Sequence, residues 1–243
     1  MALTYATEAF VFKKEDRLEA DSTFSVFTHD FGRLEVVGKA IRKITSKLKG
    51  NIEIFSLSRI EFVQGKNKKI LTEALFVKKF KNISQVPEKL VIAHRITEIL
   101  DVFLKGEQRD EKIWDMLVHM FEKLDSDSLQ SKHYQLLYCY FVGNFTSILG
   151  YGLQLSKCAV CGQTLDPRLL YFSNKEGGTI CGVCAGTHEG SIKITSDTVK
   201  ILRLILNKDW QTISRLKAAE KIPLEALENY VRYLSNNNSF KKE

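Results

Sequence analysis

The first third of the chain alternates between short apolar runs and polar turns, which is the pattern of small antiparallel strands. The runs are rich in β-branched and aromatic residues, and polar segments such as His29–Gly32 and Gln64–Lys68 separate them. An OB-fold barrel of five strands is the first candidate, and it is a frequent binder of single-stranded nucleic acid. An SH3-like barrel would give a similar pattern, so the topology stays open. The predicted strands are Thr4–Phe12, Thr23–Thr28, Arg33–Ile41, Ile52–Val63 and Lys69–Phe80.

The period of the apolar residues changes at Pro87. From there they recur every three or four positions, which indicates amphipathic helices, and a proline suits the first turn of a helix. Cys139 lies inside the third of these helices, where we expect it to be a small buried hydrophobe. The pattern predicts helices that begin at Pro87, at about Ile113, at about Leu129, at Ser196 and at Pro223.

Four of the five cysteines form two Cys-x-x-Cys knuckles with 19 residues between them. This spacing falls within the about 15–20 residues that separate the knuckles of four-cysteine zinc sites. The N-terminus shows no signal-peptide pattern and no apolar run reaches the roughly 18 residues of a membrane span, which predicts a cytoplasmic chain with reduced thiols. Metal binding is therefore favoured over disulfides, and no βαβ unit supports a thioredoxin-like redox pair. The expected ligands are Cys158, Cys161, Cys181 and Cys184.

Four thiolates leave no open coordination position, so we expect one structural Zn²⁺ per chain. A deaminase-type zinc would need a His-x-Glu pair, whereas His188 and Glu189 are adjacent. The sequence also lacks a phosphate-binding glycine-rich loop with Lys-Ser/Thr, a Gly-x-Ser-x-Gly elbow and a His-Glu-x-x-His helix. These features favour a binding protein over an enzyme, and a closed thiolate site argues against a metal-dependent hydrolase.

The patterns together predict an α+β multidomain protein. An N-terminal five-stranded OB-fold barrel is followed by an all-α domain that carries a four-Cys zinc-binding insertion. The predicted limits are 1–82 for the nucleic-acid-binding barrel, 83–150 for the first part of the helical domain, 151–192 for the zinc segment, and 193–243 for the C-terminal helices that complete the helical domain.

Positive charge is concentrated in the predicted barrel. Residues 1–81 carry 16 Lys and Arg against 10 Asp and Glu, which accounts for six of the seven net positive charges of the chain. Such a concentration is typical of proteins that bind a polyanion, most often nucleic acid, although a merely soluble basic surface would carry the same charge.

Most of these cations lie in two stretches. Residues 32–51 contain a single acid, Glu35, and predict a flexible basic loop on the barrel rim, which could follow a phosphate backbone without reading bases. A second group lies in and beside the hairpin loop at 64–68. The candidate DNA-binding residues are Arg33, Lys39, Arg42, Lys43, Lys47, Lys49, Lys66, Lys68 and Lys69.

Several short motifs occur here in an order that is known from one family. They are Glu19-x-Asp21, Val26-Phe27-Thr28, His29-x-x-Gly32-Arg33-Leu34, Lys39, Arg42-Lys43, Ser46-Lys47-Leu48, the four-cysteine knuckles, Phe172-Ser173 and Gly177-Gly178. On these residues the chain resembles the RecO family of bacterial recombination mediators over essentially its whole length. It departs from the family at Ala40 and Ile44, which stand where the family often has glycine and proline.

The resemblance implies a non-enzymatic, nucleoid-associated protein of the cytoplasm. It implies binding of single- and double-stranded DNA through the OB barrel, and annealing of complementary strands. It also implies that the chain acts with the partner RecR to help load the RecA recombinase onto DNA coated by single-strand-binding protein. An alternative for the whole chain is a zinc-ribbon RNA-associated or structural factor with a basic β-barrel.

The family also contacts the acidic, apolar C-terminal tail of the single-strand-binding protein through its helical domain. A pocket for that tail needs apolar surface beside basic side chains. An apolar helix around Leu202–Leu206, with Lys200, Arg203 and Arg215 close in sequence, is the candidate. The plainer interpretation is that these leucines are core and these charges are surface.

Overall fold

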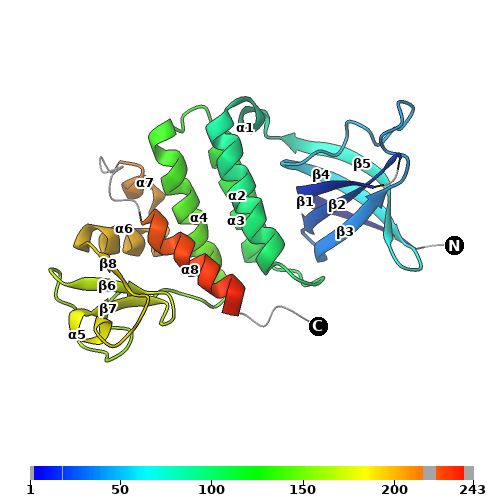
Figure 1. Cartoon of the computed structure of the whole chain (residues 1–243). Coiled ribbons are helices and arrows are strands. Elements are labelled where there is room, and N and C mark those ends of the chain that lie inside the picture. Colours follow the sequence, from blue (N-terminus) through cyan, green and yellow to red (C-terminus); the bar gives the residue numbers. More distant parts are fainter. Residues whose placement is uncertain (1–2, 18, 216–222, 238–243) are drawn as a thin grey trace. The chain divides into compact units, whose positions relative to one another are not determined.

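The computed structural model describes residues 3–17, 19–215 and 223–237. The chain divides into two compact units, Met1–Asp127 and Ser128–Glu243. The first unit contains the N-terminal strands and the first three helices, and the second contains the four knuckle cysteines and the remaining helices (Figure 1). The boundary between the units falls inside the segment 83–150, and the domain limits inferred from the sequence stay a prediction.

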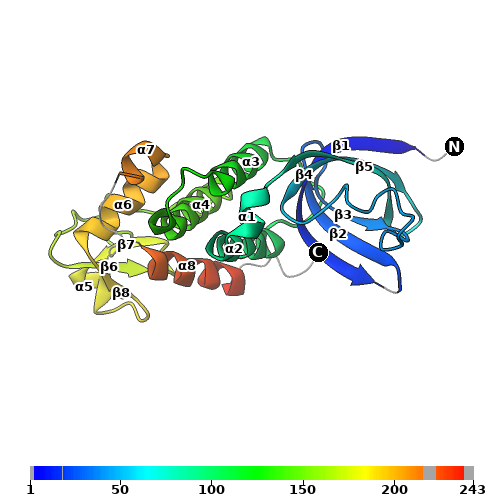
Figure 2. The same ribbon diagram turned by 90° about the horizontal axis from the view of Figure 1, so that it is seen from above.

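The first unit begins with a closed five-stranded barrel (Figure 2). Its order is β1-β2-β3-β5-β4, and only the β3–β5 pair is parallel. This Greek-key closure confirms the predicted OB-fold barrel. The strands are β1 (Thr4–Arg17), β2 (Asp21–Thr28), β3 (Gly32–Gly38), β4 (Ser56–Gln64) and β5 (Lys69–Lys79).

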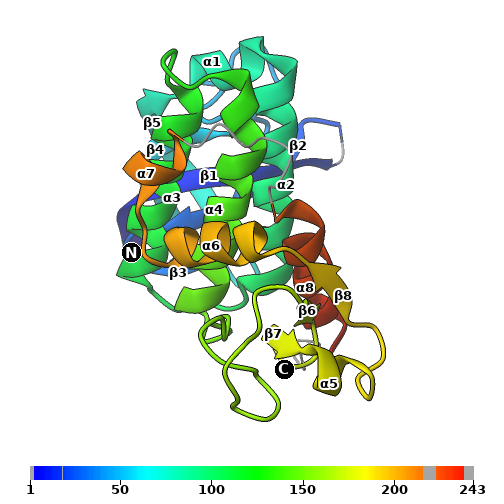
Figure 3. The same cartoon turned by 90° about the vertical axis from the view of Figure 1, so that its left-hand side faces the viewer.

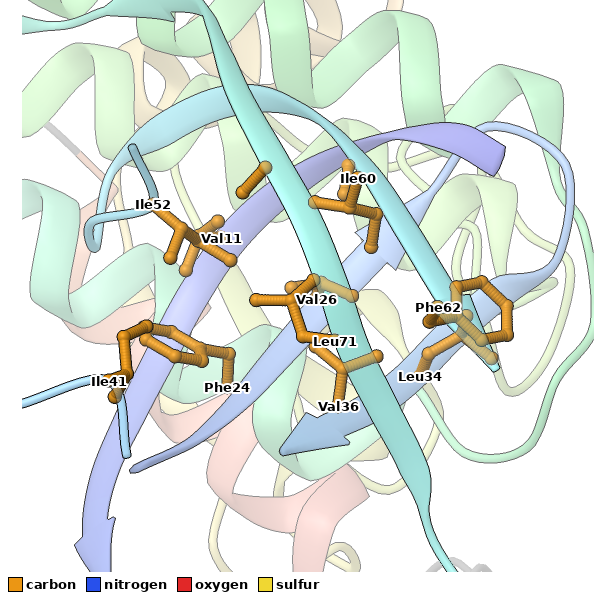
Figure 4. Packing of buried hydrophobic residues seen from close by; sticks show 12 residues of the cluster. Val11, Phe24, Val26, Leu34, Val36, Ile41, Ile52, Ile60, Phe62 and Leu71 are labelled. Atoms are coloured by element: carbon orange, nitrogen blue, oxygen red, sulfur yellow. The ribbon is translucent and has the colours of Figure 1, made fainter. Parts of the chain in front are cut away.

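Twelve buried apolar residues fill the barrel (Figure 4). Two of them, Ile41 and Ile52, come from the loop at 39–55, and they lie beside Phe24 and Val11. The prediction that Ile41 ends the third strand and Ile52 begins the fourth is wrong. Both side chains continue the apolar pattern of the strands, but they fill the barrel interior from the loop, which pattern alone cannot distinguish from strand pairing.

Three helices follow in the same unit: α1 (Lys81–Gln85), α2 (Pro87–Phe103) and α3 (Glu111–Asp125). The Asp110 carboxylate caps α3 by accepting a hydrogen bond from the Ile113 backbone N–H at 3.0 Å. At the other end of α3, the buried Lys89 of α2 donates to the Ser126 carbonyl oxygen at 2.9 Å. The ammonium thus binds where the helix dipole is negative, which explains how a lysine can be only 3% exposed.

Aromatic side chains join α3 to the barrel. The Phe121 ring lies 4.4 Å from the Phe10 ring, 5.8 Å from Phe80 and 5.9 Å from Phe55, measured between centroids. All four side chains are buried. Such tilted and offset pairs add to the free energy of burial, so the barrel and these helices share one core.

The second unit is built around α4 (Tyr134–Ile148), a helix that is buried on nearly all sides and follows the short 3₁₀ turn η1 (Ser131–His133). α6 (Ser196–Leu206) crosses α4 (Figure 3). The crossing is close because α4 presents Gly143, where an added Cβ would lie 2.7 Å from Ile205. Asn144 completes the contact by donating to the Ile205 carbonyl oxygen at 3.0 Å. The helices α7 (Trp210–Ile213) and α8 (Leu224–Asn237) follow.

A small antiparallel sheet that the sequence did not predict surrounds the knuckles. Its order is β7-β6-β8, and the single-turn helix α5 (Gly182–Ala185) follows β7. The turn between β6 and β7 needs Gly177, which has a φ of 59° and would place a Cβ 2.9 Å from the Tyr230 hydroxyl of α8. The strands are β6 (Leu170–Ser173), β7 (Gly178–Cys181) and β8 (Ile192–Ile194).

Candidate metal centre and nucleic-acid interface

The four knuckle cysteines converge on one point. The Sγ atoms of Cys158, Cys161, Cys181 and Cys184 all lie within 4.8 Å of one another, and those of Cys161 and Cys181 are 3.9 Å apart. A tetrahedral zinc with bonds of about 2.3 Å would hold its sulfurs about 3.8 Å apart. All four are free thiols. The donor set and its spacing therefore fit a single closed metal site.

Backbone geometry aims the thiols. In the first knuckle the Gly162 N–H donates to the Cys158 carbonyl oxygen at 2.9 Å, a turn that Gly162 makes with a φ of 70°. In the second, β7 ends at Cys181 and α5 carries Cys184. Gly182, between them, packs against Leu169, whose side chain would have to move for any larger residue because an added Cβ would lie 2.2 Å from it.

The electrostatics of the thiols also fit a metal site. Burial raises the pKa of Cys158, but the N–H groups of Cys161, Cys181 and Val160 outweigh it and lower that pKa to about 6. Burial and the neighbouring thiols, with the Cys158 thiolate, raise the pKa of Cys184 to about 12. Of these two thiols, Cys158 ionises more easily by itself, and a bound cation would supply the positive charge that Cys184 needs to ionise.

The sheet around the knuckles is attached to α8. The Tyr230 ring meets the Phe172 ring edge-on at 6.0 Å, and its hydroxyl donates to the Tyr151 carbonyl oxygen at 3.2 Å. Burial raises the pKa of this phenol to about 12. The metal ligands thus belong to a packed part of the second unit, as a structural metal requires.

A cavity of about 410 Å³ lies on the outer face of the barrel. It is bordered by β2, β3 and the loop between β4 and β5, which is the face on which OB-folds bind oligonucleotides. Three predicted DNA-binding residues line it, and Arg17, at the end of β1, is a cation that sequence reasoning missed. The charged residues of the cavity are Arg17, Arg33, Glu35, Lys68, Lys69 and Glu107.

Two of the predicted cations in this cavity are engaged with protein groups. The Arg33 guanidinium donates to the Asp101 carboxylate at 2.6 Å and to the Leu104 carbonyl oxygen at 2.8 Å, and its side chain is 13% exposed. Lys69 forms an ion pair with Glu107. Arg33 therefore ties β3 to the end of α2, and what charge it still offers a ligand is partly neutralised.

Lys66 and Lys68 are exposed on the β4–β5 turn. The Gly65 N–H closes this turn by donating to the Lys68 carbonyl oxygen at 2.9 Å. Lys68 lines the cavity. The second predicted group of cations thus borders the oligonucleotide face of the barrel.

The other predicted cations lie on the loop at 39–55. Lys39, Lys43, Lys47 and Lys49 are exposed, and within the described ranges no carboxylate lies within ion-pairing distance of them. Arg42 differs, because it pairs with Asp16 at 3.4 Å and its backbone N–H donates to the Ala20 carbonyl oxygen at 3.0 Å. Arg42 thereby ties the loop to the turn between β1 and β2.

The loop has more structure than the flexible loop that the sequence predicted. Backbone hydrogen bonds from Lys43 to Ala40 and from Ser46 to Lys43, both 3.1 Å, fold it into successive turns. Ile41 is buried in the barrel and Leu48 is half-buried against it, while Ile44 is 92% exposed. The exposed lysines are therefore carried on an anchored backbone.

Two of the three candidate tail-binding cations of the second unit contact protein groups. Lys200 pairs with Asp197 at 3.2 Å, and Arg203 donates through Nε to the Leu155 carbonyl oxygen at 3.2 Å. Arg215 is exposed.

The apolar residues of the predicted tail-binding site are also used in the core. Leu202 and Ile205 are fully buried in the core of the unit. This favours the plainer interpretation of these two residues, and the tail-binding assignment stays a prediction.

Two family descriptions match the chain. Residues 1–80 match Recombination protein O N terminal, and residues 84–239 match Recombination protein O C terminal. The chain belongs to the RecO family. The match confirms the resemblance seen in the sequence, and it spans both units of the structure.

Individual relatives support the same family assignment. The chain is 31% identical over 228 residues to a DNA repair protein RecO of Dehalococcoides mccartyi, which covers 94% of this chain and 88% of the relative. It is 28% identical to a DNA repair protein RecO of Caldanaerobacter subterraneus, with 93% and 91% covered. Within the described residues, no helix has both the length and the apolar character needed to cross a membrane.

Proposed function

We propose that this RecO-family chain is a DNA-binding recombination mediator in DNA repair. The observation that carries the proposal is the group of exposed lysines on the anchored loop at 39–55, which begins next to the oligonucleotide face of an OB barrel. Its relatives bear the name DNA repair protein RecO, which supports the same role.

Binding would be mainly to phosphates. Lysines on a loop can contact the backbone of either single- or double-stranded DNA without selecting a sequence. A surface that neutralises two strands at once also lowers their mutual repulsion, which would promote annealing of complementary strands.

The metal would be one structural Zn²⁺ per chain, held by the four thiolates, with no catalytic role. The protein would then act without chemistry of its own, in the cytoplasm. RecR, the RecA recombinase and the tail of the single-strand-binding protein are the partners that family membership suggests. For the tail, Lys200, Arg203 and Arg215 remain the candidate contacts.

The test is a salt titration of the affinity for a single-stranded oligonucleotide. We expect replacement of Lys39, Lys43, Lys47 and Lys49 with alanine to weaken binding of all sequences similarly. Each lost phosphate contact should flatten the log–log salt slope by about 0.7, so the full effect is at most about 3. Arg42 is kept because it anchors the loop.

A matched control removes the same charge from the second unit. It replaces the exposed Lys132, Lys157, Lys175 and Lys193 with alanine. Equal loss of affinity in both variants would mean that net charge alone matters and would refute an interface on the loop. Acceleration of DNA annealing separates a mediator from a passive RNA-binding factor, which need not anneal strands.

A further inference from the structure

A second cavity lies in the first unit, apart from the cavity on the oligonucleotide face of the barrel. It has a volume of about 350 Å³. Its walls come from the end of the loop at 39–55, from β1, from the end of β5 and from α1 and α2. Its lining residues are Lys14, Ile52, Glu53, Ile54, Phe55, Ser56, Lys79, Phe80, Lys81, Ser84, Leu90 and His94.

Cations surround this cavity, whereas its floor is apolar. Lys14, Lys79 and Lys81 contribute three positive charges, against one acid, Glu53, which lies 3.7 Å from Lys79. Its apolar lining residues are Ile52, Phe55 and Phe80, which are buried, and Ile54 and Leu90, which are half-buried. The cavity is therefore suited to a ligand that joins an anionic group to a flat or apolar group.

The backbone at the floor is strained. Phe55 has a φ of 58°, a left-handed conformation that is unfavourable for a bulky residue. Its N–H donates to the Val11 carbonyl oxygen at 2.8 Å, and its ring stacks on Phe121, which hold it in place. Strained residues that the surrounding structure holds in place are concentrated at functional sites.

The position of the cavity indicates which ligand. Residues 52–55 form its wall and are also the end of the loop whose lysines carry the proposed phosphate contacts. Lys14 lies 3.7 Å from Asp16, the carboxylate that also pairs with Arg42 of that loop. The cavity therefore adjoins the loop that carries the exposed lysines.

We infer that this cavity binds one nucleotide of a single strand, with its phosphate at Lys14 and Lys81 and its base against Ile54 and His94. The exposed His94 ring meets the Phe55 ring edge-on at 5.0 Å between centroids. Imidazole rings are among the side chains on which unpaired bases stack. The inference rests on the proposed function, because it adds a base-contacting site to a surface that otherwise contacts phosphates.

The experiment titrates thymidine 5′-monophosphate into the ¹⁵N-labelled full-length chain and follows amide shifts. We expect shifts at Phe55, Lys81 and His94, weaker effects from thymidine or inorganic phosphate alone, and no effect in a Lys81→Ala, His94→Ala double variant. Lys81→Arg with His94→Phe should retain binding because it keeps a charge and a ring. Shifts that persist in the alanine variant, or that occur only elsewhere, would overturn the inference.

Affinity for oligothymidylate distinguishes this inference from the proposed function. The alanine double variant should bind roughly tenfold more weakly than the unchanged chain, in the range expected for losing one stacked base. The loop-lysine variant should bind oligothymidylate weakly, but its amides should still shift when thymidine 5′-monophosphate is added. Full affinity in the double variant together with loss in the loop variant would reject the nucleotide site and leave DNA binding intact. No binding to the unchanged chain would reject both. Stronger binding at these amides of an acidic peptide with a terminal apolar residue than of thymidine 5′-monophosphate would also overturn the inference.

Discussion

Replacement of Arg33 with alanine tests whether this residue holds the fold or binds DNA. The sequence predicts a DNA contact, because Arg33 belongs to the basic stretch of a nucleic-acid-binding barrel. The structure shows its guanidinium donating to the Asp101 carboxylate and to the carbonyl oxygens of Asp101 and Leu104, with the Phe12 ring 5.4 Å away. We therefore expect Arg33→Ala to lower stability far more than affinity.

The loss of unfolding free energy can be estimated from the groups that Arg33→Ala leaves without a hydrogen-bond partner. The Asp101 carboxylate keeps Lys13 at 2.9 Å, and the Asp101 carbonyl oxygen keeps Lys105 at 2.7 Å. Among the described contacts, the Leu104 carbonyl oxygen has no donor besides Arg33. One lost charge-assisted bond and one weakened, partly exposed ion pair come to about 2 kcal/mol of unfolding free energy.

The assay is urea unfolding followed by tryptophan fluorescence. Each unit has one of the two tryptophans, so a Trp210→Phe background leaves the buried Trp114 as the reporter of the first unit. Lys68→Ala is the matched control, since Lys68 is exposed in the same cavity and should lower affinity without lowering stability. An Arg33→Ala variant with unchanged stability and tenfold weaker DNA binding would refute the reasoning.

Two further predictions use Trp114 as the reporter of the first unit and Trp210, in a Trp114→Phe background, as the reporter of the second. Chelation of the metal, or Cys184→Ser, should lower the unfolding free energy of the second unit by several kcal/mol, because structural zinc binds with roughly 10–16 kcal/mol, and Trp114 should report an unchanged first unit. Elemental analysis should find one zinc per chain, and a chain free of zinc would contradict the prediction. Burial raises the pKa of Asp101, but hydrogen bonds from Lys13 and Arg33 outweigh it and hold that pKa below its usual range. This stabilisation is present above the unfolded-state pKa of about 3.9 and is lost as the pH falls through the folded-state value, so Asp101→Asn should flatten the acid limb of the first unit's stability curve.

The sequence could predict those features that depend on local patterns. Alternation located the five strands, and the spacing of the cysteines located the metal ligands, because each knuckle is a local turn. The strand ends at Ile41 and Ile52 were wrong because a buried loop residue and a buried strand residue give the same signal. The sheet around the knuckles was missed because strands of three or four residues are too short for alternation to appear.

Features that join distant parts of the chain could not be predicted from the sequence. Counting charge identified Arg33 as a cation, but its partner Asp101 lies 68 positions away. Lysine is usually a surface residue, but Lys89 is buried because its ammonium group binds the carbonyl oxygen at the end of α3. Charge therefore predicts that a barrel is basic, whereas the structure shows which cations remain available for a ligand.

Ala40 connects the sequence to the shape of the basic loop, and its replacement with glycine is the last prediction. The resemblance to the RecO family implies a glycine at the position of Ala40. Ala40 has a φ of 50°, and its N–H donates to the Asp21 carboxylate at 2.7 Å. The left-handed conformation costs an L-residue roughly 1–2 kcal/mol, while glycine gives back roughly 0.5–1 kcal/mol in the entropy of the unfolded chain. Ala40→Gly should therefore stabilise the first unit by up to about 1 kcal/mol in the Trp114 assay. Ala6→Gly, at an exposed position of β1, is the control and should destabilise it by a similar amount. Equal destabilisation by both substitutions would mean that Ala40 is not strained, and that glycine is not needed for the turn that displays the lysines.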